Sequence, residues 1–282
     1  MNVVIAAAGG LCIGFLIRIS TPLLAGVKHE GKVFRWPWVE FLTAAAAALT
    51  EAFDPGGPPW HLFVWLLVAI TSTDFLCKLI PDRITFPGAV VGVGVSALWW
   101  ETIAGFLNHD ALLSMMGIGP GPLAGVALSL LGAAVGFGIL ELFRRVMGAA
   151  VGMEVMGMGD SKLLMLAGAW LGPSMVLLSI APGLLCGLVM GVLYTRITKT
   201  PHLPFGPALC AGAFVTLLWG DRILAAWTGI GETMRTMPRH LSLALTLGLL
   251  VVAVLLLVRV RRRRAEYTKM IEEEYDSLED RD

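Results

Sequence analysis

The sequence predicts an all-α fold, a bundle of about eight to nine transmembrane helices. Hydrophobic residues make up 56% of the 282 residues and charged residues only 15%, which is too little charge for a water-soluble domain of this length. Apolar runs close to membrane thickness recur along the chain, separated by charged or Pro/Gly clusters. Acidic and basic residues number 21 each, so the net charge of zero gives no indication of a nucleic-acid partner.

The apolar runs place the expected spans in order. The first, at 2–19, has no basic segment before it, so we interpret it as a retained span and not a cleaved signal. Two runs, at 38–54 and 161–172, are short for a bilayer of about 30 Å. The pair Gly172-Pro173 is expected to divide what would otherwise be one very long helix. The other expected spans are 60–77, 85–105, 122–143, 174–194, 204–220 and 240–258.

Lysine and arginine concentrate in alternate loops, the bias that marks the cytoplasmic side of a membrane protein. This bias predicts an external amino terminus and a cytoplasmic carboxyl terminus. The loop 221–239 is an exception, because its three arginines would lie outside. We expect a membrane-embedded core over 1–220, one additional span within 221–258 and a charged cytoplasmic tail over 259–282.

Asp74 is an aspartate near the end of an apolar helix. It follows the apolar stretch 62–70, and a carboxylate at that depth is costly, which favours a functional role. The alternative is an ion pair with Lys78, one helical turn further on. Asp82 lies in an Ile-Pro-Asp turn, where turn formation is a sufficient explanation, and we do not expect it to be catalytic.

A second aspartate lies in the segment 157–162, which reads G-M-G-D-S-K and opens another apolar helix. Asp160 could simply cap the backbone N–H groups of that helix. Gly157 and Gly159 would let an extended substrate backbone approach the carboxylate, although a flexible loop is the alternative. Lys162 is expected either to orient Asp160 electrostatically or to extend toward the lipid headgroups.

Asp74 and Asp160, once brought together, would share one proton, so that an acid and a base coexist near neutral pH. The base can then activate water for attack on a peptide carbonyl, while the acid donates a proton to the leaving nitrogen. The five histidines lie outside the expected spans or at their ends, and no C-x-x-C occurs, so neither a His-based triad nor a metal site is predicted. A proton- or cation-coupled transporter is the alternative function, because membrane carboxylates also bind protons and cations.

With these motifs placed, the sequence resembles the type IV prepilin leader peptidases, the membrane aspartic peptidases (family A24) of type IV pilus and type II secretion systems. A weaker similarity at 10–18 precedes the main ones. Four stretches carry the resemblance. Two of them surround the aspartates: 73–87 around Asp74 and 157–164 around Asp160. The other two are 37–44 (with Glu40) and the P-F-G-P-A segment at 204–208.

The resemblance implies that Asp74 and Asp160 are the two catalytic aspartates of a G-x-G-D peptidase. Gly157, Gly159, Lys162 and Glu40 match positions that would support the site or bind substrate. The implied substrate is a prepilin or pseudopilin with a short basic leader, cut after glycine, and an apolar amino-terminal helix in contact with membrane lipid. Cleavage would take place at the cytoplasmic face of the bacterial inner membrane.

The sequence departs from the family pattern in two places. The loop 19–36 is short and has no cysteine, whereas the family's loop carries paired C-x-x-C motifs tied to N-methylation of the product. Zinc is therefore not expected, and S-adenosylmethionine would be needed only if methylation is retained. The additional span at 240–258 and its Arg-rich, acidic tail are expected to fix orientation, bind lipid headgroups or dock a partner.

Overall fold

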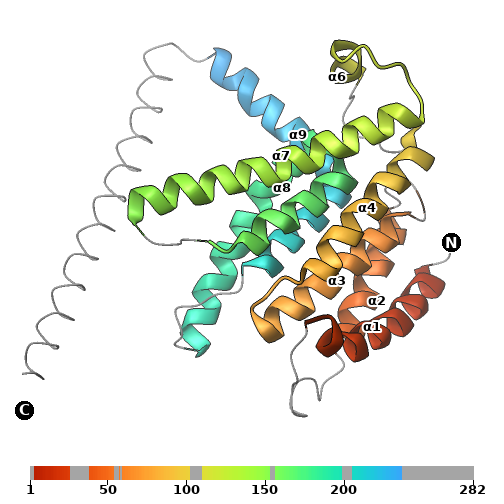
Figure 1. The fold of residues 1–282 in the computed structure, drawn as a ribbon, viewed down its shortest axis with the longest axis vertical. Coiled ribbons are helices and arrows are strands. Elements are labelled where there is room, and N and C mark those ends of the chain that lie inside the picture. The colour runs from red at the N-terminus through yellow and green to blue at the C-terminus, as the bar shows by residue number, and fades with distance from the viewer. Residues whose placement is uncertain are drawn as a thin grey trace, which may run out of the picture. The chain divides into compact units, whose positions relative to one another are not determined.

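A computed structural model of the chain describes residues 3–25, 38–53, 57, 59–101, 110–152, 156–198 and 205–236. All regular elements in these ranges are helices (Figure 1). In order they are α1 (Val3–Ala25), α2 (Trp38–Phe53), α3 (Pro59–Cys77), α4 (Asp82–Leu98), α6 (Asp110–Met115), α7 (Pro122–Val151), α8 (Met158–Thr198) and α9 (Gly206–Thr236). The chain divides into two compact units at Leu224, and the residues discussed below belong to the first.

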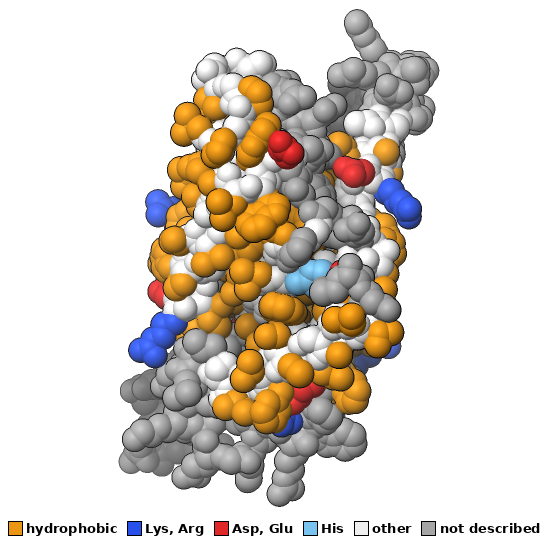
Figure 2. All heavy atoms as spheres, turned by 90° about the vertical axis from the view of Figure 1, so that its right-hand side faces the viewer, with side chains coloured by type: hydrophobic (Ala, Val, Ile, Leu, Met, Phe, Trp, Pro, Cys, Tyr) orange, Lys and Arg blue, Asp and Glu red, His pale blue; other side chains and the backbone are white. Residues whose placement is uncertain are grey.

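The described helices confirm a helical membrane protein, but not the expected number of spans. Four of them, α1, α7, α8 and α9, contain segments long and apolar enough to cross a membrane. Helices α2 and α4 have only 16 and 17 residues, which is short for a bilayer crossing. Hydrophobic side chains spread over much of the face seen in Figure 2, as expected for a surface that meets lipid. The expected span at 240–258 and the tail over 259–282 lie outside the described residues.

The predicted break at Gly172-Pro173 is present, but as a kink inside α8. Gly172 adopts φ 77° and ψ 175°, a conformation that side-chain-bearing residues rarely adopt. Pro173, which follows, has no N–H to continue the helical ladder. The expected segments 161–172 and 174–194 are therefore two helical segments that meet at this break, as the sequence predicts.

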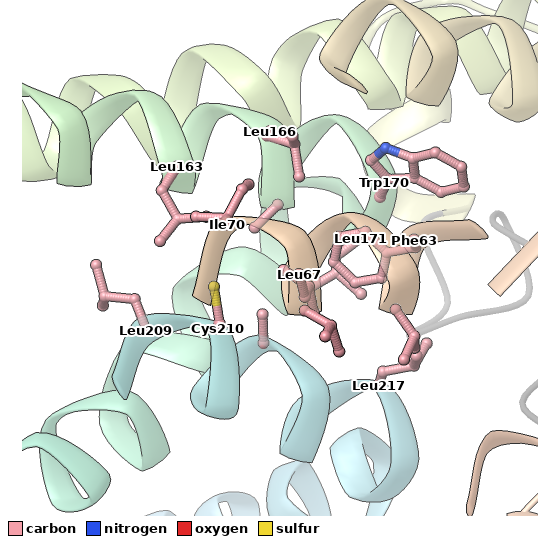
Figure 3. Packing of buried hydrophobic residues seen from close by; sticks show 14 of the residues in the cluster. Phe63, Leu67, Ile70, Leu163, Leu166, Trp170, Leu171, Leu209, Cys210 and Leu217 are labelled. Carbon is pink, nitrogen blue, oxygen red and sulfur yellow. The ribbon is translucent and has the colours of Figure 1, made fainter. Parts of the chain in front are cut away.

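The core that positions the site lies between α3, α8 and α9. The rings of Phe63 and Trp170 stack at a centroid distance of 5.5 Å. One end of this core holds Ile70 of α3 beside Leu163 of α8, with Leu209 of α9 below them (Figure 3). Because Phe63 meets Trp170 while Ile70 meets Leu163, α3 and α8 run antiparallel. The last turn of α3 therefore lies beside the first turn of α8.

Hydrogen bonds to main-chain carbonyls hold the neighbouring helices against α8. The indole Nε1–H of Trp170 donates to the carbonyl of Gly88 in α4 at 2.9 Å. The hydroxyl of Ser129 in α7 donates to the carbonyl of Ala169 at 2.6 Å. All four residues are far from the ends of their helices, so α4 and α7 are fixed to the middle of α8. Polar bonds of this kind help membrane helices associate, because the bilayer gives little hydrophobic driving force between them.

Candidate active site

The antiparallel packing of α3 and α8 brings the two predicted aspartates together. Asp74 lies about one turn beyond Ile70, and Asp160 lies about one turn before Leu163. Both residues are buried, with exposed fractions of 5% and 8%. They are close enough for their charges to repel each other. Two carboxylates in such a position cannot both ionise easily. They therefore share one proton near neutral pH.

The structure does not support the alternative roles of these aspartates. In the described residues, Asp74 forms no ion pair with Lys78. Helix α3 ends there instead, because Lys78 takes φ 49° and its backbone N–H donates to the main-chain carbonyl of Asp74 at 2.8 Å. Asp160 is the third residue of α8, and within the described ranges its carboxylate caps no backbone N–H. Its own N–H donates to the carbonyl of Gly157 at 3.3 Å.

A third segment reaches the pair from the start of α9. The backbone N–H of Gly206 donates to Oδ2 of Asp74 at 3.0 Å, a contact between residues 132 positions apart. A Cβ at position 206 would lie 2.6 Å from the same oxygen, so any other residue would have to displace the Asp74 carboxylate. Sequence reasoning noted the P-F-G-P-A segment but did not predict Gly206 as a site residue. The sequence feature that points to this position is a glycine directly before a proline at the start of an apolar helix.

Ile80 fills the space between the two glycine-containing segments. A Cβ added to Gly159 would lie 3.1 Å from Cβ of Ile80, and one added to Gly206 would lie 3.2 Å from its Cδ1. Gly159 therefore allows close packing against Ile80. Gly157 has open space around it, because the nearest atom to an added Cβ is the nitrogen of Gly159 at 3.9 Å. The expected approach of a substrate backbone at these two glycines stays a prediction.

Lys162 pairs with Asp82, and not with Asp160 as one interpretation of the sequence expected. Its Nζ donates to both carboxylate oxygens of Asp82 at 2.6 and 2.8 Å. The same ammonium lies 5.7 Å from the centre of the Phe86 ring, within the range of a cation–π interaction. The pair joins the start of α4 to the start of α8, close to the two aspartates but without direct contact to them.

Glu40 belongs to a separate polar contact between α1 and α2. Its Oε1 accepts from Nε of Arg18 at 3.0 Å. The two helices approach closely there, since a Cβ added to Gly14 would lie 2.5 Å from Cα of Glu40. Among the described residues, no contact joins Glu40 to Asp74 or Asp160, and its supporting role stays a prediction.

The same region contains one of the four cysteines, Cys210. All four cysteines are free thiols. Cys210 of α9 is buried, its sulfur points toward α3 in Figure 3, and it hydrogen-bonds to Thr71. In the part of the chain that the structure describes, no group of three or more His, Cys, Asp or Glu side chains is arranged to hold a metal ion.

The two buried carboxylates lie at adjoining helix ends and repel each other. This arrangement is typical of helical membrane proteins that carry out acid–base chemistry. The comparisons with known proteins make this specific. The sequence pattern of the type IV leader peptidase family matches residues 61–192, which include both aspartates. This chain belongs to that family.

The curated relatives share a name, "Prepilin leader peptidase/N-methyltransferase". The protein of Aeromonas hydrophila is 34% identical over 196 residues, which cover 67% of this chain and 60% of the relative. That of Stutzerimonas stutzeri is 31% identical over 223 residues, 74% of this chain and 69% of the relative. That of Bacillus subtilis strain 168 is 31% identical over 218 residues, 72% of this chain and 77% of the relative. No solved structure gave a significant match.

The match to the relatives is partial. The aligned segment spans about 60% of the length of the Aeromonas and Pseudomonas aeruginosa relatives. Gly206 and the rest of α9 lie beyond the residues that the family pattern matches. The family pattern therefore covers the region that holds the two aspartates.

Proposed function

We propose that this chain is a membrane aspartyl endopeptidase that removes the short basic leader of type IV prepilins or pseudopilins. The observation that carries the proposal is the meeting of Asp74 and Asp160, both buried and electrostatically coupled, at the adjoining ends of α3 and α8. The names of the relatives support the substrate class, since each is called a prepilin leader peptidase.

The chemistry follows from one proton shared by two carboxylates. The ionised aspartate takes a proton from water, and the water oxygen attacks the scissile peptide carbonyl. The protonated aspartate gives its proton to the leaving nitrogen as the C–N bond breaks. Burial of both side chains keeps bulk water away, which strengthens the electrostatic interactions within the site. We propose that the reaction needs neither zinc nor another metal.

We further propose that the site opens at the cytoplasmic face of the bacterial inner membrane, with the amino terminus outside and the carboxyl terminus inside. The distribution of lysine and arginine supports this orientation. At that face the enzyme could receive a substrate whose apolar helix lies in lipid while its basic leader stays in water. Single cysteines placed in the loops of a cysteine-free variant would test the orientation through labelling with a membrane-impermeant maleimide.

The decisive test is cleavage of a prepilin by membranes that contain the full chain. Asp74→Asn and Asp160→Asn should each abolish leader removal while the protein remains in the membrane at normal abundance. Asp221→Asn is the matched control, because Asp221 is exposed and should be dispensable. Retained cleavage in either active-site variant, or proton flux in proteoliposomes without any cleavage, would contradict the proposal.

Mass spectrometry of the product answers a second question in the same experiment. With S-adenosylmethionine present, the product mass reports both the cut site and any methyl group on the new amino terminus. The relatives are named as N-methyltransferases as well as peptidases. We propose that this chain acts as a peptidase alone, because its first loop has no cysteine. A methylated product would overturn that part of the proposal.

A further inference from the structure

Helix α9 begins directly against Asp74, and this contact makes the two aspartates unequal. The first amides of a helix have no partner within the helix and must be satisfied in another way. In α9, Ala208 and Leu209 donate to the carbonyl of Phe205 at 3.1 and 3.2 Å, and Pro207 has no N–H. The remaining amide, that of Gly206, donates to Oδ2 of Asp74 at 3.0 Å. The start of α9 thus presents a single unused donor, and Asp74 receives it.

The fit around this hydrogen bond is tight. Any side chain at position 206 would place its Cβ 2.6 Å from Oδ2 of Asp74 and 3.1 Å from Cγ. Asp74 is nearly fully buried, so water cannot readily replace a lost donor. A hydrogen bond to a buried carboxylate stabilises its charged form, and the positive end of the α9 dipole acts in the same direction.

In the part of the chain that the structure describes, Asp160 receives no equivalent hydrogen bond. Among the described residues, no N–H or O–H donates to its carboxylate, although it is buried to a similar degree. Asp160 lies in the first turn of α8, whose dipole favours its charge, whereas Asp74 lies between the negative end of α3 and the positive end of α9, whose dipoles oppose each other. The helix dipoles therefore do not favour charge on Asp74, and only a direct hydrogen bond does so. The buried thiol of Cys210 is near enough for the charges of both carboxylates to act on it, and the ammonium of Lys162 bonds to Asp82. Among the described residues, the Gly206 amide is therefore the hydrogen-bond donor that distinguishes them.

We infer that the Gly206 amide holds the negative charge on Asp74, which makes Asp74 the base, while Asp160 holds the shared proton and is the acid. This assignment rests on the proposed peptidase function. Asp74 takes a proton from water as the water oxygen bonds to the scissile carbonyl carbon. The proton of Asp160 passes to the nitrogen as the C–N bond breaks. Transfer of the proton from Asp74 to Asp160 restores the starting state.

The first test needs no turnover. In enzyme labelled with ¹⁵N-glycine, the Gly206 amide resonance is identified by its absence from Gly206→Ala. Asp74→Asn keeps a carbonyl acceptor of the same shape but removes the charge. We expect this variant to shift the Gly206 amide proton upfield at neutral pH, because an ionised acceptor deshields the donor. Asp160→Asn should leave the resonance in place.

Two outcomes of this measurement would overturn the assignment. If Asp74→Asn leaves the Gly206 resonance unchanged, Asp74 is already neutral in the wild-type enzyme. If Asp160→Asn moves the resonance downfield, Asp74 becomes ionised only when the charge of its neighbour is removed. Because no cleavage is measured, these results are independent of whether the substrate proposal is correct.

The second test uses the pH profile of kcat/KM. Gly206→Ala displaces the Asp74 carboxylate from its donor, so the ionised form is less favoured and the acidic limb should move to higher pH by about one unit. The alkaline limb, which depends on the proton of Asp160, should move less, although both limbs belong to the coupled pair. Gly220→Ala is the control in α9, beyond the break at Trp219, since its Cβ would press on the flexible Cε of Met175 at 2.6 Å and not on the aspartates.

The control should keep the wild-type profile. An unchanged profile in Gly206→Ala, or movement of the alkaline limb alone, would overturn the assignment. An alternative to the alanine variant is glycolic acid at position 206, introduced by cell-free translation, which replaces the N–H by an oxygen and adds no atom. If the wild-type enzyme does not cut prepilin at all, the proposed function fails, and the resonance experiment still decides the charge on Asp74.

Discussion

Two of the regions of this molecule that hold buried carboxylates have opposite surroundings. Between α1 and α2, Glu40 is paired with the guanidinium of Arg18 at 3.0 Å. Between α3 and α8, Asp74 and Asp160 have each other and one backbone amide, and in the described residues no cation pairs with either. A carboxylate held by a cation stays ionised and stabilises packing. A carboxylate held against another carboxylate can exchange a proton, which is what hydrolysis requires.

The same contrast, between a carboxylate paired with a cation and one without such a partner, is found within a few residues of Asp160. Lys162 is only two residues from Asp160, yet its ammonium bonds to Asp82. A direct ion pair with Asp160 would keep that aspartate ionised and remove the shared proton. The position of Lys162 thus supports the G-x-G-D segment without neutralising the carboxylate at its centre. Substitutions at the aspartate pair, at Glu40 and at the Lys162–Asp82 pair should therefore differ in their effects on cleavage and on stability.

The largest effect is expected for the aspartate pair. Asp74→Asn and Asp160→Asn should each lower kcat by about 10²–10⁴-fold or more, because each removes one partner of the acid–base pair. The double variant should be no slower than the slower single variant, since residues that act as a unit are not additive. Single-turnover cleavage of a prepilin in detergent measures all three. Additive losses would show that the two aspartates act independently.

A smaller and different effect is expected for Glu40→Gln. This change leaves Arg18 without its charged partner and should lower the free energy of unfolding by about 1–3 kcal/mol. The rate of cleavage, measured below the unfolding temperature, should stay within a few-fold of wild type. Thermal unfolding in detergent followed by intrinsic fluorescence tests the first part. A loss of cleavage comparable with that of Asp160→Asn would place Glu40 in the catalytic site and remove the contrast.

The Lys162–Asp82 pair should have a weaker influence. The side chain of Asp82 is 55% exposed, so the ion pair contributes at most about 1 kcal/mol. If this entire free energy stabilised the transition state, its loss would lower the rate about fivefold. Asp82→Asn and Lys162→Gln should lower kcat/KM to a similar extent, and the double variant should be no worse. The exchanged pair Asp82→Lys/Lys162→Asp should recover part of the loss. A large loss in Lys162→Gln alone would indicate direct contact with substrate.

The smallest effect is expected from removal of metal ions. Prepilin cleavage by membranes treated with EDTA or a zinc-selective chelator should proceed at the untreated rate, because the two carboxylates supply both the acid and the base. Addition of zinc after chelation controls for non-specific effects of the chelator. Loss of cleavage that zinc restores would contradict a reaction carried by the aspartates alone.

Several features of the site could be predicted from the sequence because they are local. A carboxylate at the end of an apolar helix is costly wherever the helix packs, so Asp74 and Asp160 could be identified before their contacts were known. The break at Gly172-Pro173 also follows from the two residues themselves. The number of spans was predicted less well. Four of the described helices are long and apolar enough to cross a membrane, and α2 and α4, which the hydropathy pattern predicts as spans, have only 16 and 17 residues.

The sequence by itself determined that the chain is a helical membrane protein and which two carboxylates are available for chemistry, because burial cost and helix breaking depend on composition over short stretches. Only the tertiary structure decided the partners of those carboxylates. The Gly206 amide reaches Asp74 across 132 positions, and Lys162 reaches Asp82 across 80. Contacts over such distances depend on how antiparallel helices pack against one another, and no local pattern specifies that packing.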